Sequence, residues 1–197
     1  MDPEPVGDMD SCDGRLTASA LFHILEDRMH ALKAQDVVVL LKLISLGIGA
    51  WTYESLSEDL GISASQIHRS LVRASGAHLY DREDRRVHRR NLSEFLLHGV
   101  KYAFPAQPGA RSRGVPTGRS AAPLSMTLAG QGTFPLVWPS ESGELIGDTV
   151  EPLHGCVVHA TSQDALLYEL LALIDSLRVG AARERSLASG LLAERLT

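Results

Sequence analysis

Polar and cationic side chains recur at helical spacing between positions 63 and 73. Ile67, Leu71 and Ala74 would form the buried face of one helix, because they recur at intervals of three and four residues. The opposite face, or its N-terminal end, would then carry Ser63, Ser65, Gln66, His68, Arg69 and Arg73. Glutamine pairs with adenine edges and arginine with guanine edges, while serine hydroxyls can bind phosphate. The free N–H groups at the helix start also favour a phosphate, so this helix is a candidate for the major groove of DNA.

The residues just before this helix predict how it is positioned. Leu56 and Leu60 lie on one face of a shorter helix, and Gly61 suits the sharp turn after it, where φ is often positive. Ser63 can cap the second helix, with Gln66 three residues later completing a capping box. We therefore predict a helix–turn–helix over residues 53–75.

A β-hairpin over residues 79–88 should follow the second helix. Three arginines, Arg82, Arg85 and Arg86, lie in or near its turn, where they could reach a phosphate backbone or a minor groove. In the alternative interpretation, the carboxylates of residues 81–84 pair with these arginines, and the turn is simply solvated.

The charge distribution supports a local polyanion-binding surface. The whole chain has a formal net charge of −5, but residues 64–119 hold eleven basic and four acidic side chains. Residues 1–63 hold four basic and eleven acidic side chains, and residues 120–197 hold four basic and nine acidic ones. A basic block on an acidic chain favours a specific site for polyanions over general adhesion to them.

The sequence resembles the winged helix–turn–helix superfamily, in the manner of MarR-like bacterial regulators. The resemblance covers residues 16–90 and is carried by Leu56, Leu60-Gly61-Ile62-Ser63, Ile67-His68-Arg69, Leu71 and the 79–88 hairpin. Ser57, where alanine is usual, and Ala77-His78, at the entry to the hairpin, depart from the pattern. Beyond residue 90 the segments LSEFLLHGVKYAFPA, RGVPT, VWP and LYELLALIDSLRVGAARER resemble uncharacterised bacterial transcriptional regulators. The resemblance implies a bacterial, DNA-binding protein, but it identifies neither an effector nor a target.

The expected fold class is α+β, mainly α, with four parts along the chain. Residues 1–14 are an acidic tail expected to be disordered, and residues 15–104 a winged helix–turn–helix domain. Within that domain we expect a helix over residues 16–34, and a second over residues 36–46, where the valines leave a strand as the alternative. Asn91 should cap a further helix.

The segment 105–160 is rich in proline and glycine, so we expect loops, short strands and little helix there. Arg111, Arg113 and Arg119 lie in a glycine-containing stretch of this segment. They could form a flexible basic arm on DNA or an ordinary solvated loop.

Two helices should close the chain, at residues 162–179 and 181–196, within a C-terminal segment of residues 161–197. The first is apolar over more than half its circumference, which predicts a second surface that covers it. We expect this surface to come from a homodimer, with a palindromic DNA site. The alternative is that these helices pack onto Leu21, Leu25 and Leu40 of the same chain.

Several classes of function are disfavoured. The two cysteines, Cys12 and Cys156, exclude a disulfide framework and favour a cytoplasmic setting. His154, Cys156 and His159 have zinc-like spacing but lack a nearby fourth ligand, so we expect no metal and no cofactor. No nucleophile, metalloprotease or phosphate-loop motif occurs, so we expect no enzyme, and no apolar run is long enough to cross a membrane.

The sequence therefore supports two hypotheses. The first is a sequence-specific transcriptional regulator that binds double-stranded DNA as a homodimer. The second is a protein-interaction module, antitoxin-like or scaffold-like, whose main partner is an unidentified protein. Salt dependence of binding separates them, since phosphate contacts weaken steeply as salt rises.

Overall fold

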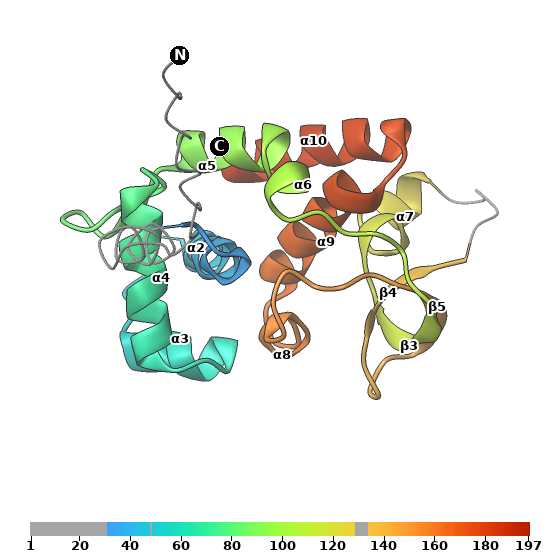
Figure 1. The fold of residues 1–197 in the computed structure, drawn as a ribbon, viewed down its shortest axis with the longest axis horizontal. Coiled ribbons are helices and arrows are strands. Elements are labelled where there is room, and N and C mark those ends of the chain that lie inside the picture. The colour runs from blue at the N-terminus through green and yellow to red at the C-terminus, as the bar shows by residue number, and fades with distance from the viewer. Residues whose placement is uncertain (1–30, 48, 129–133) are drawn as a thin grey trace, which may run out of the picture. The chain divides into compact units, whose positions relative to one another are not determined.

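The computed structural model describes residues 31–47, 49–128 and 134–197, and Figure 1 shows their arrangement. Predictions for residues 1–30, including the acidic tail and most of the helix over 16–34, lie outside the described residues. At the end of that predicted helix, residues 31–33 are not helical, and the next helix begins at Ala34. The longer helices are α2 (Ala34–Leu46), α3 (Tyr53–Leu60), α4 (Ala64–Gly76), α5 (Arg89–His98), α9 (Ala165–Val179) and α10 (Ala182–Leu196). The chain is of mixed α+β class and mainly helical, as the sequence predicted.

Helix α2 is deeply buried. Val37, Val38, Val39, Leu40 and Leu41 are all fully buried, so this helix is covered on every side. A helix that is apolar all round is stable only in such a place. The helical prediction for this valine-rich run is thus confirmed over the strand alternative, and Gly47 ends the helix with a φ of 65°.

Helices α3 and α4 are joined by a short turn, as predicted. Gly61 ends α3 in the left-handed region with a φ of 64°. Ser57 stabilises the turn, because its hydroxyl donates to the carbonyl oxygen of Ile62 at 2.6 Å. That bond explains why serine suits a position where the resemblance favoured alanine. The buried face of α4 contains Ile67, Leu71 and Ala74, in agreement with the sequence.

A two-stranded antiparallel hairpin follows α4, formed by β1 (Tyr80–Asp81) and β2 (Arg86–Val87). It leads into α5, which begins at Arg89 and not at a cap on Asn91. The Asn91 capping prediction is wrong, since its amide donates to the carbonyl of His78 at 2.8 Å instead. The amide therefore ties α5 to the start of the hairpin. The short helix α6 (Val100–Ala103) completes this half of the chain.

The proline- and glycine-rich segment folds into short strands and short helices around a small closed barrel of three strands. The strands are β3 (Arg111–Pro116), β4 (Leu136–Pro139) and β5 (Leu145–Thr149). β3 is antiparallel to both partners, and β4 is parallel to β5. Gly114 permits this tight closure, because a Cβ there would lie 2.1 Å from the Trp138 carbonyl oxygen. The 3-10 helix η1 (Gly118–Ser120), α7 (Leu124–Thr127) and α8 (Val157–Thr161) connect these parts.

Helix α9 packs against α2, α6, α8, α10 and η1 of the same chain. Nine of its fifteen residues are buried, so its own chain covers the apolar circumference that had suggested a dimer. Residues 32–197 form one compact unit with a core that extends from α2 to α10. None of the helices within the described ranges has the length and apolar character needed to cross a bilayer.

Candidate nucleic-acid interface

The outer face of α4 presents three of the predicted polar side chains to solvent. Ser65, His68 and Arg69 are exposed, and no ion pair engages Arg69 within the described part of the chain. The His68 ring lies beside Tyr53 of α3, with ring centroids 6.0 Å apart. Ile67 is fully buried on the inner face. The helix is thus anchored on one side and offers a donor-rich surface on the other.

Two of the predicted DNA-binding residues form the N-terminal cap of α4. Ser63 accepts a hydrogen bond from the N–H of Gln66 at 3.3 Å, and the N–H of Ser63 donates to Gln66 Oε1 at 3.0 Å. The capping box is confirmed, and it stabilises the first turn of the helix. Because Gln66 Oε1 is occupied by this cap, only the amide nitrogen of Gln66 remains to meet a base or a phosphate.

Arg73 requires a correction. The sequence analysis placed it on the exposed face, but it is buried and forms a bidentate ion pair with Asp36 of α2. Nε lies 2.8 Å from Oδ2 and Nη2 lies 2.6 Å from Oδ1. The buried stripe of α4 is wider than its apolar residues indicate, because it includes Ser70 and faces the first turn of α2. Arg73 therefore positions α4 and is not available to DNA.

The hairpin turn next to α4 is organised by Asp81. Its carboxylate accepts hydrogen bonds from the N–H groups of Asp84 and Glu83, which hold the pKa of Asp81 below its ordinary value. Arg82 is exposed in this turn. No carboxylate of residues 81–84 pairs with an arginine of the hairpin within the described residues. The alternative in which carboxylates of the turn neutralise its arginines is therefore not supported by direct ion pairs among these residues.

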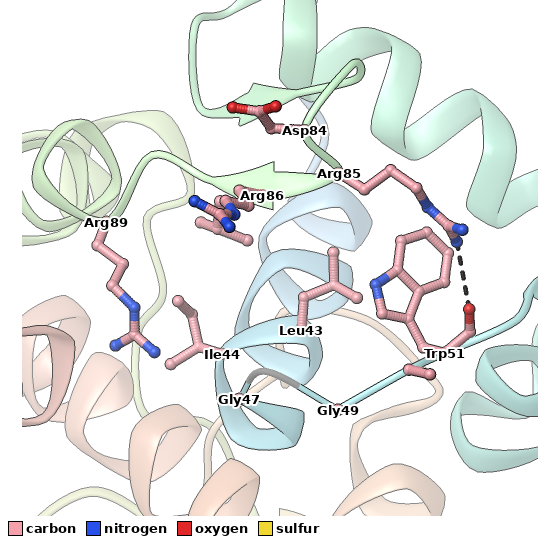
Figure 2. A pocket seen from close by; sticks show the side chains of 11 residues that line it. Leu43, Ile44, Gly47, Gly49, Trp51, Asp84, Arg85, Arg86 and Arg89 are labelled. Carbon is pink, nitrogen blue, oxygen red and sulfur yellow. Dashed lines mark hydrogen bonds between the residues drawn. The ribbon is translucent and has the colours of Figure 1, made fainter.

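Arg85 and Arg86 lie beside a pocket at the base of the hairpin. The Arg85 guanidinium lies 4.0 Å from the centroid of the Trp51 ring and donates to the Trp51 carbonyl at 3.2 Å. Arg86 lines the same pocket, together with Arg89 at the start of α5 (Figure 2). Burial, opposed by the nearby Arg85, raises the pKa of Tyr80 on β1. Of the two arginines in the hairpin turn, Arg85 is thus engaged within the chain, whereas Arg82 is exposed.

The three arginines predicted to form a basic arm belong to ordered structure. Arg111 and Arg113 lie on β3, and Arg119 lies in η1, so a flexible arm is wrong. Arg111 pairs with Asp148 and covers the Phe134 ring, while Arg113 donates to the Gly143 carbonyl. Arg119 donates to the Phe134 carbonyl and lies 3.8 Å from Glu184. Figure 1 shows β3 and α4 at opposite ends of the view, so the fold does not bring these groups together.

The histidine–cysteine cluster serves packing. His159 lies against the α3–α4 turn, where a Cβ on Gly61 would be 2.9 Å from its ring. Cys156 is buried, and burial raises the pKa of its thiol to about 11. Among the described residues, no group of three His, Cys, Asp or Glu side chains could hold a metal ion.

Comparison with protein-family models, with curated protein sequences and with solved structures finds no match to this chain.

Sequence reasoning missed two residues that shape this region. Asp36 caps α2 by accepting from the N–H of Lys33 at 2.8 Å, and it also holds Arg73. Trp51 supplies the surface on which Arg85 rests. An acidic residue in the first turn of an otherwise apolar helix was a usable signal for Asp36, because a buried carboxylate requires a cationic partner.

Proposed function

We propose that this protein is a winged helix–turn–helix regulator that binds double-stranded DNA in a sequence-specific way through α4. The observation that carries the proposal is the two-sided character of this helix. Ile67, Leu71 and the Asp36–Arg73 pair hold its inner side, while Ser65, His68 and Arg69 project from its outer side. A recognition helix must be held firmly against the rest of the domain, and it must also present free hydrogen-bond donors to base edges.

The hairpin next to α4 supports the same proposal. Arg82 is exposed at its turn and could contact the phosphate backbone on one side of the helix. The free N–H groups in the first turn of α4 would face a phosphate as well. Ser65 and Arg69, one turn apart on α4, would then read bases between these two anchors.

One observation favours the second candidate, a protein-interaction module. Glu83 and Asp84 are exposed in the same turn as Arg82, and two carboxylates there would repel a phosphate backbone. A basic protein segment would bind such a mixed surface more readily than DNA would. A homodimer stays a prediction in either case, tested by light scattering of the full-length protein.

Fluorescence anisotropy with labelled DNA from upstream of the protein's own coding region tests the proposal. We expect Arg69→Ala to weaken binding of the preferred site by about 1–3 kcal/mol, the usual contribution of a base-contacting arginine. The matched control is Arg90→Ala on α5, since its side chain is 90% exposed and its one ion pair among the described residues is with Glu94.

The same titrations at two salt concentrations separate the two candidates. DNA binding that neutralises several phosphates weakens steeply between them. Unchanged affinity of Arg69→Ala for the best site would contradict the role of α4. Binding that is insensitive to salt would favour the protein-interaction module.

A further inference from the structure

The pocket at the base of the hairpin has a volume of about 630 Å³, which is in the range of small-molecule sites. It lies between the end of α2, the loop before α3, strand β2 and the start of α5 (Figure 2). The lining comes from two stretches of the chain, residues 43–51 and 84–89, which meet only in the folded chain. The pocket is also distinct from the outer face of α4, so it is open to a function of its own.

One wall of the pocket is apolar. Leu43 and Ile44 of α2 contribute side chains that are 6% and 5% exposed, and Val87 and Trp51 are half-buried. Water in contact with such a wall is readily displaced by an apolar group, which favours a ligand with a hydrocarbon or aromatic body. A bare inorganic anion would leave this wall uncovered.

The rim of the pocket is cationic. Arg85, Arg86 and Arg89 approach it within five positions of sequence, against a single acidic lining residue, Asp84. Figure 2 shows Arg85 with Trp51 on one side and Arg89 on the other, with Arg86 between them. Within the part of the chain that the structure describes, neither Arg86 nor Arg89 forms an ion pair. The guanidinium groups of Arg86 and Arg89 at this rim are therefore not neutralised by a carboxylate of the described residues.

The geometry points to a ligand that combines both features, and we propose that this pocket binds a phosphate monoester with an apolar substituent. Two guanidinium groups match the double negative charge of a phosphate monoester, and arginine binds phosphate oxygens through paired N–H donors. The apolar substituent lies against Leu43, Ile44 and Trp51. Arg85, already resting on Trp51, closes the side of the pocket.

The proposal does not depend on DNA binding. It uses the pocket side of the hairpin, whereas the regulator proposal uses Arg69 and Arg82. A protein that fails to bind DNA could still bind the ester, so the two experiments fail separately.

Isothermal titration calorimetry of the full chain with 1-naphthyl phosphate tests the site. We expect saturable binding, and at least tenfold weaker binding of 1-naphthol, which lacks the phosphate, and of inorganic phosphate, which lacks the apolar group. The monoanion 1-naphthoate, which carries half the charge, should bind with intermediate affinity.

Variants then locate the site. Arg86→Gln and Arg89→Gln should each weaken binding of 1-naphthyl phosphate at least tenfold, and Arg90→Gln, one residue beyond the pocket, should leave it unchanged. Thermal unfolding of each variant confirms that the fold is kept. Absence of saturable binding, equal affinity for the ester and inorganic phosphate, or equal loss in Arg90→Gln would each overturn the proposal.

Discussion

The α3–α4 region and the barrel region are both rich in arginine, yet they use it differently. Each packs against one buried pair: Asp36 of α2 with Arg73 of α4 in the first, and Asp175 with Arg178 of α9, beside the barrel, in the second. Around the first pair, Arg69 remains free for solvent, whereas Arg111 and Arg119 near the second bind carboxylates and carbonyls of their own chain. The comparison shows that local positive charge in the sequence does not reveal which arginines the fold pairs within the chain.

The largest expected effect concerns the buried pair of the barrel region. Asp175 accepts hydrogen bonds from Trp138 at 2.5 Å, from Thr117 at 2.8 Å and from Arg178 at 2.6 Å. Asp175→Ala would leave the Trp138 and Thr117 donors buried without this acceptor, and Arg178, which also donates to the Phe104 and Glu151 carbonyls, without its carboxylate. We expect a loss of about 3–5 kcal/mol in the free energy of unfolding, measured by urea denaturation. A loss below about 1 kcal/mol would show that this region does not depend on its pair.

The pair of the first region should behave in a similar way. Arg73→Ala leaves the Asp36 carboxylate buried without its cation, so we expect a loss of about 3 kcal/mol in stability. Arg69→Ala, on the opposite face of the same helix, is the matched control and should change stability by less than about 0.5 kcal/mol. Equal losses of stability in Arg73→Ala and Arg69→Ala would contradict the view that Arg73 fixes α4 in place and that Arg69 does not.

A smaller effect is expected where the start of α9 contacts α2. Asp164 caps α9 and also binds Lys42 and Ser45 of α2. Burial alone would raise the pKa of Asp164, but hydrogen bonds from the Leu167 N–H, Ser45 and Lys42 outweigh it and hold the pKa below its ordinary value.

Because its folded-state pKa is lowered, Asp164 stabilises the fold above its unfolded pKa near 4, and this contribution is lost as the pH falls through the lower folded value. Asp164→Asn should therefore cost about 1 kcal/mol at pH 7. The difference from wild type should shrink below pH 4 in urea titrations. A difference that is independent of pH would contradict this account.

The smallest expected effect concerns DNA binding by the arginines of the two regions, and this prediction rests on the proposed function. Replacing Arg111, Arg113 and Arg119 together by glutamine should leave the salt dependence of DNA binding unchanged, since these arginines are engaged at the barrel. Arg82→Gln in the hairpin turn should reduce the salt slope by about 1. A flatter slope in the triple variant would show that the barrel also contacts the backbone.

Local sequence patterns were enough to predict much of the fold. The spacing of Leu56, Leu60, Ile67 and Leu71 predicted two helices and their buried faces, and Gly61 predicted the turn between them. These features depend on residues close together in the chain, where helical periodicity, glycine conformation and capping act directly. The hairpin followed from the same kind of local signal.

Only the tertiary structure decided how the polar side chains are used. Whether Arg73 faces solvent or Asp36 depends on a partner 37 positions away, and the sequence pattern of α4 alone does not reveal it. The barrel escaped sequence reasoning for the same reason, because β3 pairs with strands more than twenty residues away. The core closed over α9 within one chain because α2, α6, α8, α10 and η1 converge on it. Sequence thus determined which faces are apolar. Long-range packing determined which charges remain free, since the partners of arginines such as Arg73 and Arg119 lie far away in the sequence.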